Sequence, residues 1–344
     1  ITSPQMKALK YIIFLLLILF IGSSTYVAVQ PNSYDVSRSR TINAPSELIY
    51  NEVIDFKNWS DWSPWVEKDP SLTFTYPEQT SGEGGSYSWV GKDGTGNMKT
   101  LAAVENDSIW QELKFEDFPA SNVYWKLNKS GQRTDVTWGM KSDNISFMMK
   151  FFAIIYGGMD KMIGPDYERG LEKLDSLIID SMSKYEITIN GVKEYGGGFY
   201  LYKTTNATNT NISSTMAKQY GSIGGYMAQN QIAMHGMPFT IYQEMNMEDG
   251  TVIMSNAIPV SQKIDITDDS GILCGYIPKT KVLKTTLQGN YTNLTQAWSE
   301  TLEYISKNNI LPSELKPFEI YTTDPGKLPN PANWITEIYI PIQE

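Results

Sequence analysis

The chain has 344 residues, with 38 Asp and Glu against 28 Lys and Arg and a formal net charge of -10. This length exceeds what one ordinary hydrophobic core serves, so we expect two domains. The acidic balance, without a cluster of Lys and Arg, argues against a phosphate backbone as partner, and we expect no nucleic-acid partner. A single cysteine, Cys274, excludes an internal disulfide.

The N-terminal segment is uncharged from residue 11 to residue 34, and Lys7 and Lys10 precede it. About 20 apolar residues can cross a bilayer, and preceding lysines favour a cytoplasmic N terminus. We therefore predict a signal anchor over residues 1–34, with one pass through the bacterial inner membrane and the later domains outside the cytoplasm. The alternative is a cleaved signal peptide, with Gly22 and Ser24 as its small-residue cleavage site.

The next part of the sequence predicts a first domain over residues 37–184. A strand comes first, and Asn43-Ala44-Pro45-Ser46 then begins a helix, since proline is tolerated in a first helical turn. Glycine-rich segments between short alternating stretches are typical of hairpins. The first strand is predicted at 36–42, the glycine-rich turns at 82–85 and 92–96, further strands at 109–115, 123–127 and 133–140, and a long helix with an apolar stripe at 167–182.

Three short motifs stand near the start of this domain: Ile42-Asn43-Ala44-Pro45, Asp55-Phe56-Lys57-Asn58-Trp59 and Trp62-Ser63-Pro64. With the order strand, helix, antiparallel strands, long helix, they make the segment similar to the START-like, or polyketide cyclase (SRPBCC), superfamily. The resemblance implies a helix-grip fold, in which a sheet wraps around the long helix and leaves a hydrophobic cavity. Members bind lipids, polyketides, hormones or other apolar molecules, and some are enzymes.

The first domain holds little obvious chemistry, because the only histidine of the chain, His235, lies outside it. Its tryptophans either line the cavity or form ordinary core. The Met- and Phe-rich segment 147–163 is either a mobile flap over the cavity or a buried connection to the last helix. The tryptophans in question are Trp89, Trp110, Trp125 and Trp138.

A second domain is expected over residues 185–344. After two opening strands, the pattern predicts two strand-helix-strand-strand units placed side by side. The opening strands are predicted at 185–192 and 199–203, the helices at 213–229 and 294–308, and the remaining strands at 239–245, 252–258, 282–287, 318–322 and 336–340.

The two units repeat one motif. Pro238-Phe239-Thr240-Ile241-Tyr242 recurs as Pro317-Phe318-Glu319-Ile320-Tyr321, and Tyr220 and Trp298 occupy matching places in the preceding helices. Duplicated units commonly pack about a pseudo-twofold axis, where a ligand-binding cleft is natural. Glu319 replaces Thr240 in the second copy, so one carboxylate breaks the symmetry.

Four motifs in order identify a second resemblance: Gly236-Met237-Pro238-Phe239, Gly289-Asn290-Tyr291, the Phe-Glu-Ile-Tyr strand, and Trp334-Ile335-Thr336-Glu337-Ile338-Tyr339-Ile340-Pro341. They resemble the GyrI-like effector-binding domain, which also forms the drug-sensing half of multidrug-responsive bacterial transcription regulators. The resemblance implies that the glutamate lies on the floor of an aromatic cleft and meets cationic ligands. The matching residue is Glu319.

Strand periodicity places Glu319 and Tyr321 on one face, and we expect Phe318 and Ile320 to face the helices. A buried acid among aromatic rings favours a cation, by relief of its desolvation and by cation–π attraction. The alternative is that Glu319 pairs with a lysine such as Lys316, or lies at a solvated edge. The candidate ligand-binding residues are Glu319, Tyr321, Tyr242, Thr240, Trp298, Tyr220 and Trp334, of which Trp298 and Tyr220 either wall the cleft or belong to the core.

We predict an α+β protein with an N-terminal membrane helix, a helix-grip domain and a GyrI-like domain of two pseudo-symmetric units. The predicted function is a membrane-anchored binder of small hydrophobic or cationic molecules, as a sensor or sequestering protein without a DNA-binding domain. The alternative is a hydrolase of small reactive electrophiles with Glu319 as general base. His235 has no triad around it and no Cys/His cluster is present, so we expect no metal and no cofactor.

Overall fold

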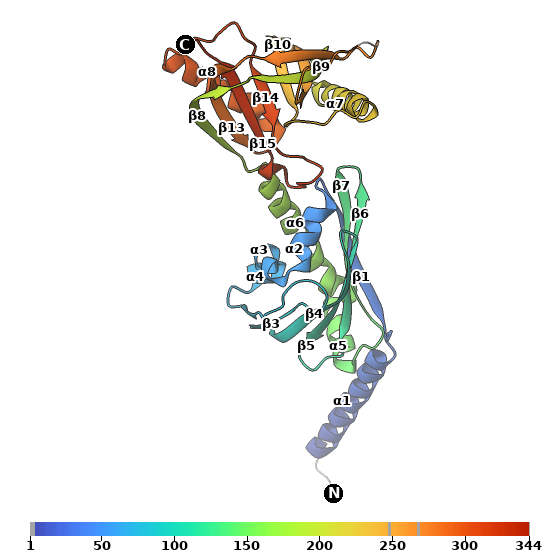
Figure 1. Cartoon of the computed structure of the whole chain (residues 1–344). Helices are drawn as coiled ribbons and strands as arrows, with labels where there is room; N and C mark the ends of the chain where they lie inside the picture. The colour runs from blue at the N-terminus through green and yellow to red at the C-terminus, as the bar shows by residue number, and fades with distance from the viewer. Residues whose placement is uncertain (1–3, 247–248, 267–268, 344) are drawn as a thin grey trace. The chain divides into compact units, whose positions relative to one another are not determined.

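The computed structural model describes residues 4–246, 249–266 and 269–343. The chain divides into two compact units, residues 1–180 and 181–344, called here the N-terminal and C-terminal units (Figure 1). The first three residues of the predicted anchor and the last residue of the predicted second domain lie outside the described residues.

The N-terminal unit is mixed α and β. Its seven strands form one antiparallel sheet in the order β1-β7-β6-β5-β4-β3-β2. Its elements are α1 (Pro4–Ala28), β1 (Tyr34–Ile42), α2 (Ser46–Ile54), η1 (Phe56–Asn58), α3 (Trp59–Trp62), α4 (Pro64–Lys68), β2 (Thr73–Thr75), β3 (Ser86–Gly91), β4 (Gly94–Val104), β5 (Ser108–Phe115), β6 (Ser121–Ser130), β7 (Arg133–Ser142), α5 (Phe147–Tyr156) and α6 (Met159–Ser183).

Helix α6 packs against this sheet, as the helix-grip prediction requires (Figure 1). The ring of Tyr167 on α6 stacks on Trp138 of β7 with centroids 4.0 Å apart. A β-carbon at Gly170 would lie 2.6 Å from Trp138 Cζ3, so glycine permits this close approach. Helix α6 begins at Met159, earlier than the sequence pattern predicted.

Tryptophans fill the space between α6, α3 and the sheet. Trp59, Trp62, Trp125 and Trp138 are all fully buried, and the rings of Trp125 and Trp138 stack 4.5 Å apart. Trp110 is partly exposed, at 36%. Two of the four tryptophans considered from the sequence, Trp125 and Trp138, are thus fully buried between the helices and the sheet.

Helix α1 differs from every other helix of the N-terminal unit in its surroundings. Its segment Ala8–Ala28 is long and apolar enough to cross a membrane, and very little of it is buried by protein. Its C-terminal end contacts α5 (Figure 1). Helix α5 exposes most of its large apolar side chains. The alternative of a buried connection is therefore wrong for this part of segment 147–163.

The C-terminal unit has an eight-stranded antiparallel sheet in the order β12-β9-β11-β10-β14-β15-β13-β8. Both of its long helices, α7 and α8, are expected from the sequence. Its elements are β8 (Glu186–Tyr195), β9 (Gly198–Thr208), α7 (Ile212–Gln229), β10 (Phe239–Asn246), β11 (Thr251–Val260), β12 (Leu273–Ile277), β13 (Thr280–Gln288), η2 (Tyr291–Asn293), α8 (Leu294–Lys307), β14 (Phe318–Tyr321), η3 (Pro331–Asn333) and β15 (Ile335–Pro341).

The order of the strands confirms the two pseudo-symmetric units. The first repeat consists of strand β9, helix α7 and strands β10 and β11, and the second consists of strand β13, helix α8 and strands β14 and β15. The two units meet at the pair β10–β14, the centre of the sheet. The strand that precedes each repeat pairs with the other repeat. Strand β8 precedes the first repeat and pairs with β13 of the second, and β12 precedes the second repeat and pairs with β9 of the first.

Candidate ligand-binding site

The repeated motif brings its two differing residues face to face. In the antiparallel pair β10–β14, Thr240 lies directly opposite Glu319. Both side chains are buried, with Glu319 only 1% exposed. The one carboxylate that breaks the symmetry of the repeat therefore lies at the seam between the two units.

Three neutral donors hold the carboxylate of Glu319. Trp298 Nε1 donates to Oε1 at 2.5 Å. The hydroxyls of Tyr242 and Tyr321 donate to Oε2 at 2.8 and 2.7 Å. Among the ion pairs of the described residues none includes Glu319, so the pairing with Lys316 considered from the sequence is not formed.

Burial controls the acidity of this group. Removal from water raises the pKa of Glu319 above its usual value, and the hydrogen bonds from Trp298, Tyr321 and Tyr242 lower it in part. Burial likewise raises the pKa of Tyr242 and Tyr321 far above the usual tyrosine value, and the charge of Glu319 adds to this rise. Both phenols therefore remain protonated donors.

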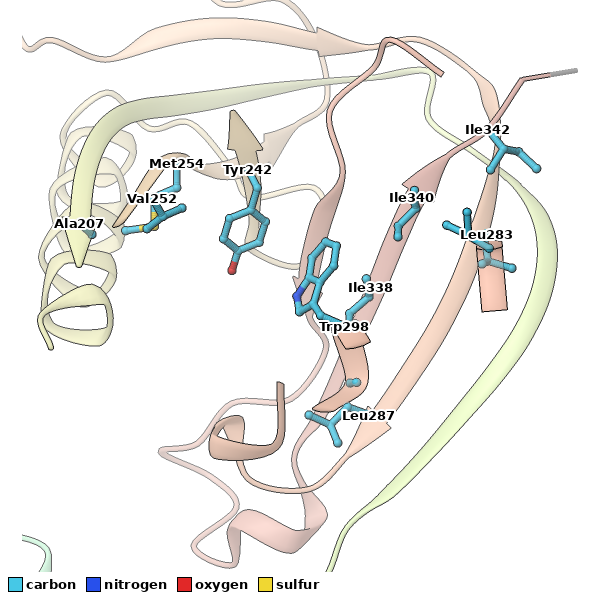
Figure 2. Packing of buried hydrophobic residues seen from close by; sticks show 12 residues of the cluster. Ala207, Tyr242, Val252, Met254, Leu283, Leu287, Trp298, Ile338, Ile340 and Ile342 are labelled. Atoms are coloured by element: carbon cyan, nitrogen blue, oxygen red, sulfur yellow. The ribbon is translucent and has the colours of Figure 1, made fainter. Parts of the chain in front are cut away.

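Aromatic rings surround the carboxylate. The ring of Tyr242 meets the indole of Trp298 edge-on at 5.6 Å, and Figure 2 shows the two side by side in the core of the C-terminal unit. The ring centroid of Tyr321 lies 6.4 Å from that of Tyr220 and 5.7 Å from that of Tyr291, and both ring pairs are edge-on. These rings form an aromatic shell around the carboxylate, and a cation is attracted by ring faces.

The first copy of the motif has a neutral network in the matching place. The hydroxyls of Tyr220 and Thr240 share a hydrogen bond of 2.8 Å, and Thr240 Oγ1 donates to Asn256 Oδ1 at 2.8 Å. Asn256 Nδ2 in turn donates to Gln219 Oε1 at 2.6 Å. In each repeat, an aromatic side chain of the helix thus forms a hydrogen bond with a side chain of the central strand. These pairs are Tyr220 with Thr240 and Trp298 with Glu319.

The strand periodicity was predicted correctly, but the assignment of faces was wrong. Glu319 faces the helices, because its partner Trp298 lies on α8. Phe318 and Ile320 instead pack on the opposite face of the sheet, against Phe239 and Tyr339. Both faces of the central strands are apolar or aromatic, so alternation alone does not identify the face that the helices cover.

Six of the seven candidate residues come together: Glu319, Tyr321, Tyr242, Thr240, Trp298 and Tyr220. Trp334 lies further from Glu319, on the outer side of Tyr291. Its ring centroid is 4.8 Å from that of Tyr291, and its Nε1 donates to Leu328 O. Tyr291 was missed as a site residue, although its Gly289-Asn290-Tyr291 motif was noted. Asn256 and Gln219 carried no signal in the sequence, because they follow no shared motif.

The carboxylate is closed off from solvent in this structure. Two hollows of about 320 and 330 Å³ lie elsewhere, one beside Trp89 and Glu116 and one beside Tyr185 and Asn333. Neither has Glu319 in its lining. Tyr220, Tyr291 and Tyr321 are only partly buried, so the side of Glu319 that these tyrosines cover is the shortest route to solvent.

Other chemistry is sparse near the site. Within the described ranges, no group of three or more His, Cys, Asp or Glu side chains could hold a metal ion. His235 lies in the loop before β10, where its backbone N–H donates to Pro259 O. The second acid of the motif region, Glu337, pairs with Lys284 at 2.7 Å and accepts from the hydroxyl of Tyr339.

Comparison with protein families supports the second resemblance. Residues 199–343 match the family model of the GyrI-like small molecule binding domain. This segment is a GyrI-like domain. All seven candidate residues lie within it, and the match includes both copies of the repeated motif.

Solved structures show two kinds of neighbour. The C-terminal domain of EcmrR is 18% identical, with 46% of this chain and 98% of that chain covered and a TM-score of 0.41. A START superfamily protein from Mycobacterium smegmatis is 14% identical, with 42% and 97% covered and a TM-score of 0.32. No curated protein matches the chain.

Proposed function

We propose that this protein is a membrane-anchored receptor that binds small lipophilic cations at Glu319 in its GyrI-like domain. One observation carries the proposal: a buried carboxylate at the seam of the two units has only neutral partners. Trp298, Tyr242 and Tyr321 stabilise its charge by hydrogen bonds, but no lysine or arginine compensates it within the described residues.

A bound cation would supply the missing charge. Desolvation disfavours the ionised form of Glu319, and an opposite charge nearby restores it. Each ring that faces the cation adds roughly 0.5–2 kcal/mol of cation–π attraction. Entry requires displacement of the partly buried side chains of Tyr291 and Tyr321, and Trp334 lies outside them, against Tyr291.

The N-terminal unit is proposed as a second binding region for apolar molecules. The indole N–H groups of Trp62, Trp125 and Trp138 are buried and have no hydrogen-bond partner among the described residues. Both amide atoms of Gln111 share this condition. Since buried polar groups are normally paired, these donors favour a small apolar guest that carries a hydrogen-bond acceptor.

The anchor is proposed to be α1, uncleaved, with both units on the extracytoplasmic side. Most of its described apolar side chains have no protein cover, and Phe14, Leu16 and Phe20 are 61, 59 and 68% exposed. Lipid is the medium that removes such a surface from water. Lipophilic molecules concentrate in the same bilayer, so an anchored receptor meets them where they are abundant. The proposal assigns the protein a sensing or sequestering role.

Calorimetric titration of the full chain in detergent with tetraphenylphosphonium tests the cation site. Glu319→Gln should weaken binding about tenfold or more, because a hydrogen bond or contact to a charged group contributes ~1.5–3 kcal/mol and each ~1.4 kcal/mol is tenfold. Glu337→Gln is the matched control, since Glu337 already has Lys284 as its cation. Tetraphenylborate, of similar shape and opposite charge, should bind far more weakly. Equal affinity in the wild type and Glu319→Gln would contradict the proposal.

The second candidate function is hydrolysis of small reactive electrophiles, with Glu319 as general base. The raised pKa of Glu319 favours it, because a base is most effective when its pKa approaches the working pH. Incubation with styrene oxide decides between the two. Turnover that persists in Glu337→Gln and disappears in Glu319→Gln supports the enzyme, and absence of turnover with tight cation binding supports the receptor.

A further inference from the structure

Helix α5 has its polarity reversed relative to an ordinary surface helix. Four apolar side chains at helical spacing, called here the α5 stripe, face outward: Met148, Phe151, Phe152 and Ile155 are 49, 42, 37 and 63% exposed. The one charged residue of the helix, Lys150, is buried on the opposite side, at 7%. A helix at a water-facing surface normally presents the opposite pattern.

The buried lysine holds α5 to the end of α1. Lys150 Nζ donates to Ala28 O at 3.2 Å, to Gln30 O at 2.8 Å and to Asn32 Oδ1 at 2.6 Å. The backbone N–H of Ile145, just before α5, donates to Asn32 O at 3.0 Å. Ala28 is the last residue of the segment that could cross a membrane, so α5 is fixed at the point where that segment ends.

The ends of α5 are well defined, so the exposed stripe belongs to a formed helix. The side chain of Ser146 accepts the N–H of Met149 and caps the N terminus. Gly157 ends the helix in the left-handed conformation, at a φ of 82°. Tyr26, two residues before Ala28, and Tyr156, the last residue of α5, are also exposed, at 59 and 60%. Tyrosine is common where a bilayer meets water.

We infer that α5 lies in the membrane–water interface beside the exit of α1, with the α5 stripe among the lipid headgroups and upper acyl chains. The inference rests on the proposed membrane anchor. A contiguous apolar patch on a soluble surface marks a binding region, and the tie through Lys150 places lipid beside this one. The helix then fixes the N-terminal unit at the bilayer surface by a second contact besides α1.

Site-directed fluorescence on the full chain tests the inference. Cys274→Ser removes the native cysteine, and Ile155→Cys, Leu16→Cys and Val90→Cys are then made one at a time in this background. Each variant is labelled with an environment-sensitive dye and placed in phosphatidylcholine nanodiscs. Val90 is a matched control, because it is 56% exposed on β3 and apolar. We expect the dye at residue 155 to be blue-shifted and quenched by nitroxides on the upper acyl chain. The dye at residue 16 should be quenched best by nitroxides near the bilayer centre, and the dye at residue 90 by neither.

The three positions separate failure of the inference from failure of the anchor. If the dye at residue 16 is quenched and the dye at residue 155 behaves like that at residue 90, α1 spans the membrane but α5 does not contact it, and the inference is wrong. If the dye at residue 155 is blue-shifted but not quenched by lipid nitroxides, protein covers the stripe and the inference is again wrong. An unquenched dye at residue 16 removes the anchor, and the inference with it.

Discussion

Two glutamates on neighbouring strands, Glu319 and Glu337, have opposite surroundings. Glu337 of β15 pairs with Lys284 and accepts from Tyr339, whereas Glu319 of β14 accepts only from neutral donors. Their side chains lie on opposite faces, because Glu337 lies beside Ile320 in the register of the two strands. One acid thus has a lysine as its partner, and the other has no cationic partner among the described residues.

This asymmetry makes a prediction about stability and pH. Burial raises the pKa of Glu319 in the folded state, so between its unfolded and folded pKa values the folded state holds more protons. The contribution of this group to the free energy of unfolding is fully present below the unfolded pKa and is lost as pH rises through the folded pKa. Glu319→Gln, which carries no titrating proton, should remove this part of the pH dependence.

Urea unfolding of the full chain in detergent at a series of pH values measures the effect. Glu337→Gln controls for the loss of one acid, since it removes a lysine ion pair instead. If the wild type and Glu319→Gln lose stability in parallel as pH rises, Glu319 is not the buried acid described.

Glu319 could be identified from the sequence because the motif occurs twice, and Glu319 is the position at which the second copy has an acid in place of Thr240. Tyr291 was missed, since this residue reaches the site from the η2 segment and has no counterpart in the repeat. The Asn256–Gln219 pair was missed for another reason: amide side chains join a network through three-dimensional contact, which motif comparison does not record.

For strand β14, the alternation of side chains along the strand predicts which residues share a face. It does not predict which of the two faces the helices cover. That choice depends on the crossover of α8, and the central strands are apolar on both faces. Helix α5 poses the converse difficulty. Its Met- and Phe-rich sequence predicted burial or a flap, and only the position of Lys150 against the end of α1 shows how the helix is held.

The role of Lys150 can be tested directly. Lys150→Met removes the donor of three hydrogen bonds, to Ala28 O, Gln30 O and Asn32 Oδ1. Each hydrogen bond contributes ~0.5–1.5 kcal/mol, so the junction of α1 and α5 should open more often without them. Hydrogen–deuterium exchange of residues 145–157 should rise.

Lys161→Met on the neighbouring helix α6 is the control, because Lys161 is exposed and bonds none of these three acceptors. Unchanged exchange of α5 in Lys150→Met would show that the lysine does not hold the junction.

At the scale of the molecule, the duplication predicted the pseudo-symmetric sheet but not the exchange of its outer strands. Strand β8 precedes the first unit yet pairs with β13 of the second, and β12 precedes the second yet pairs with β9 of the first. Such long-range pairing has no local signature, because strand patterns specify faces and not neighbours. The exchange ties the two units together and so stabilises the seam that holds Glu319.

In the proposed function, a cation replaces a proton as the partner of Glu319. Calorimetric titration with tetraphenylphosphonium in buffers of different ionisation heat measures the protons released on binding. We predict release of up to one proton per chain at acidic pH, because the raised pKa leaves the carboxyl partly protonated, and a decline of this release toward zero as pH rises. Glu319→Gln should release none. Binding without proton release at every pH, or the same release from Glu319→Gln, would show that the cation does not bind at this carboxylate.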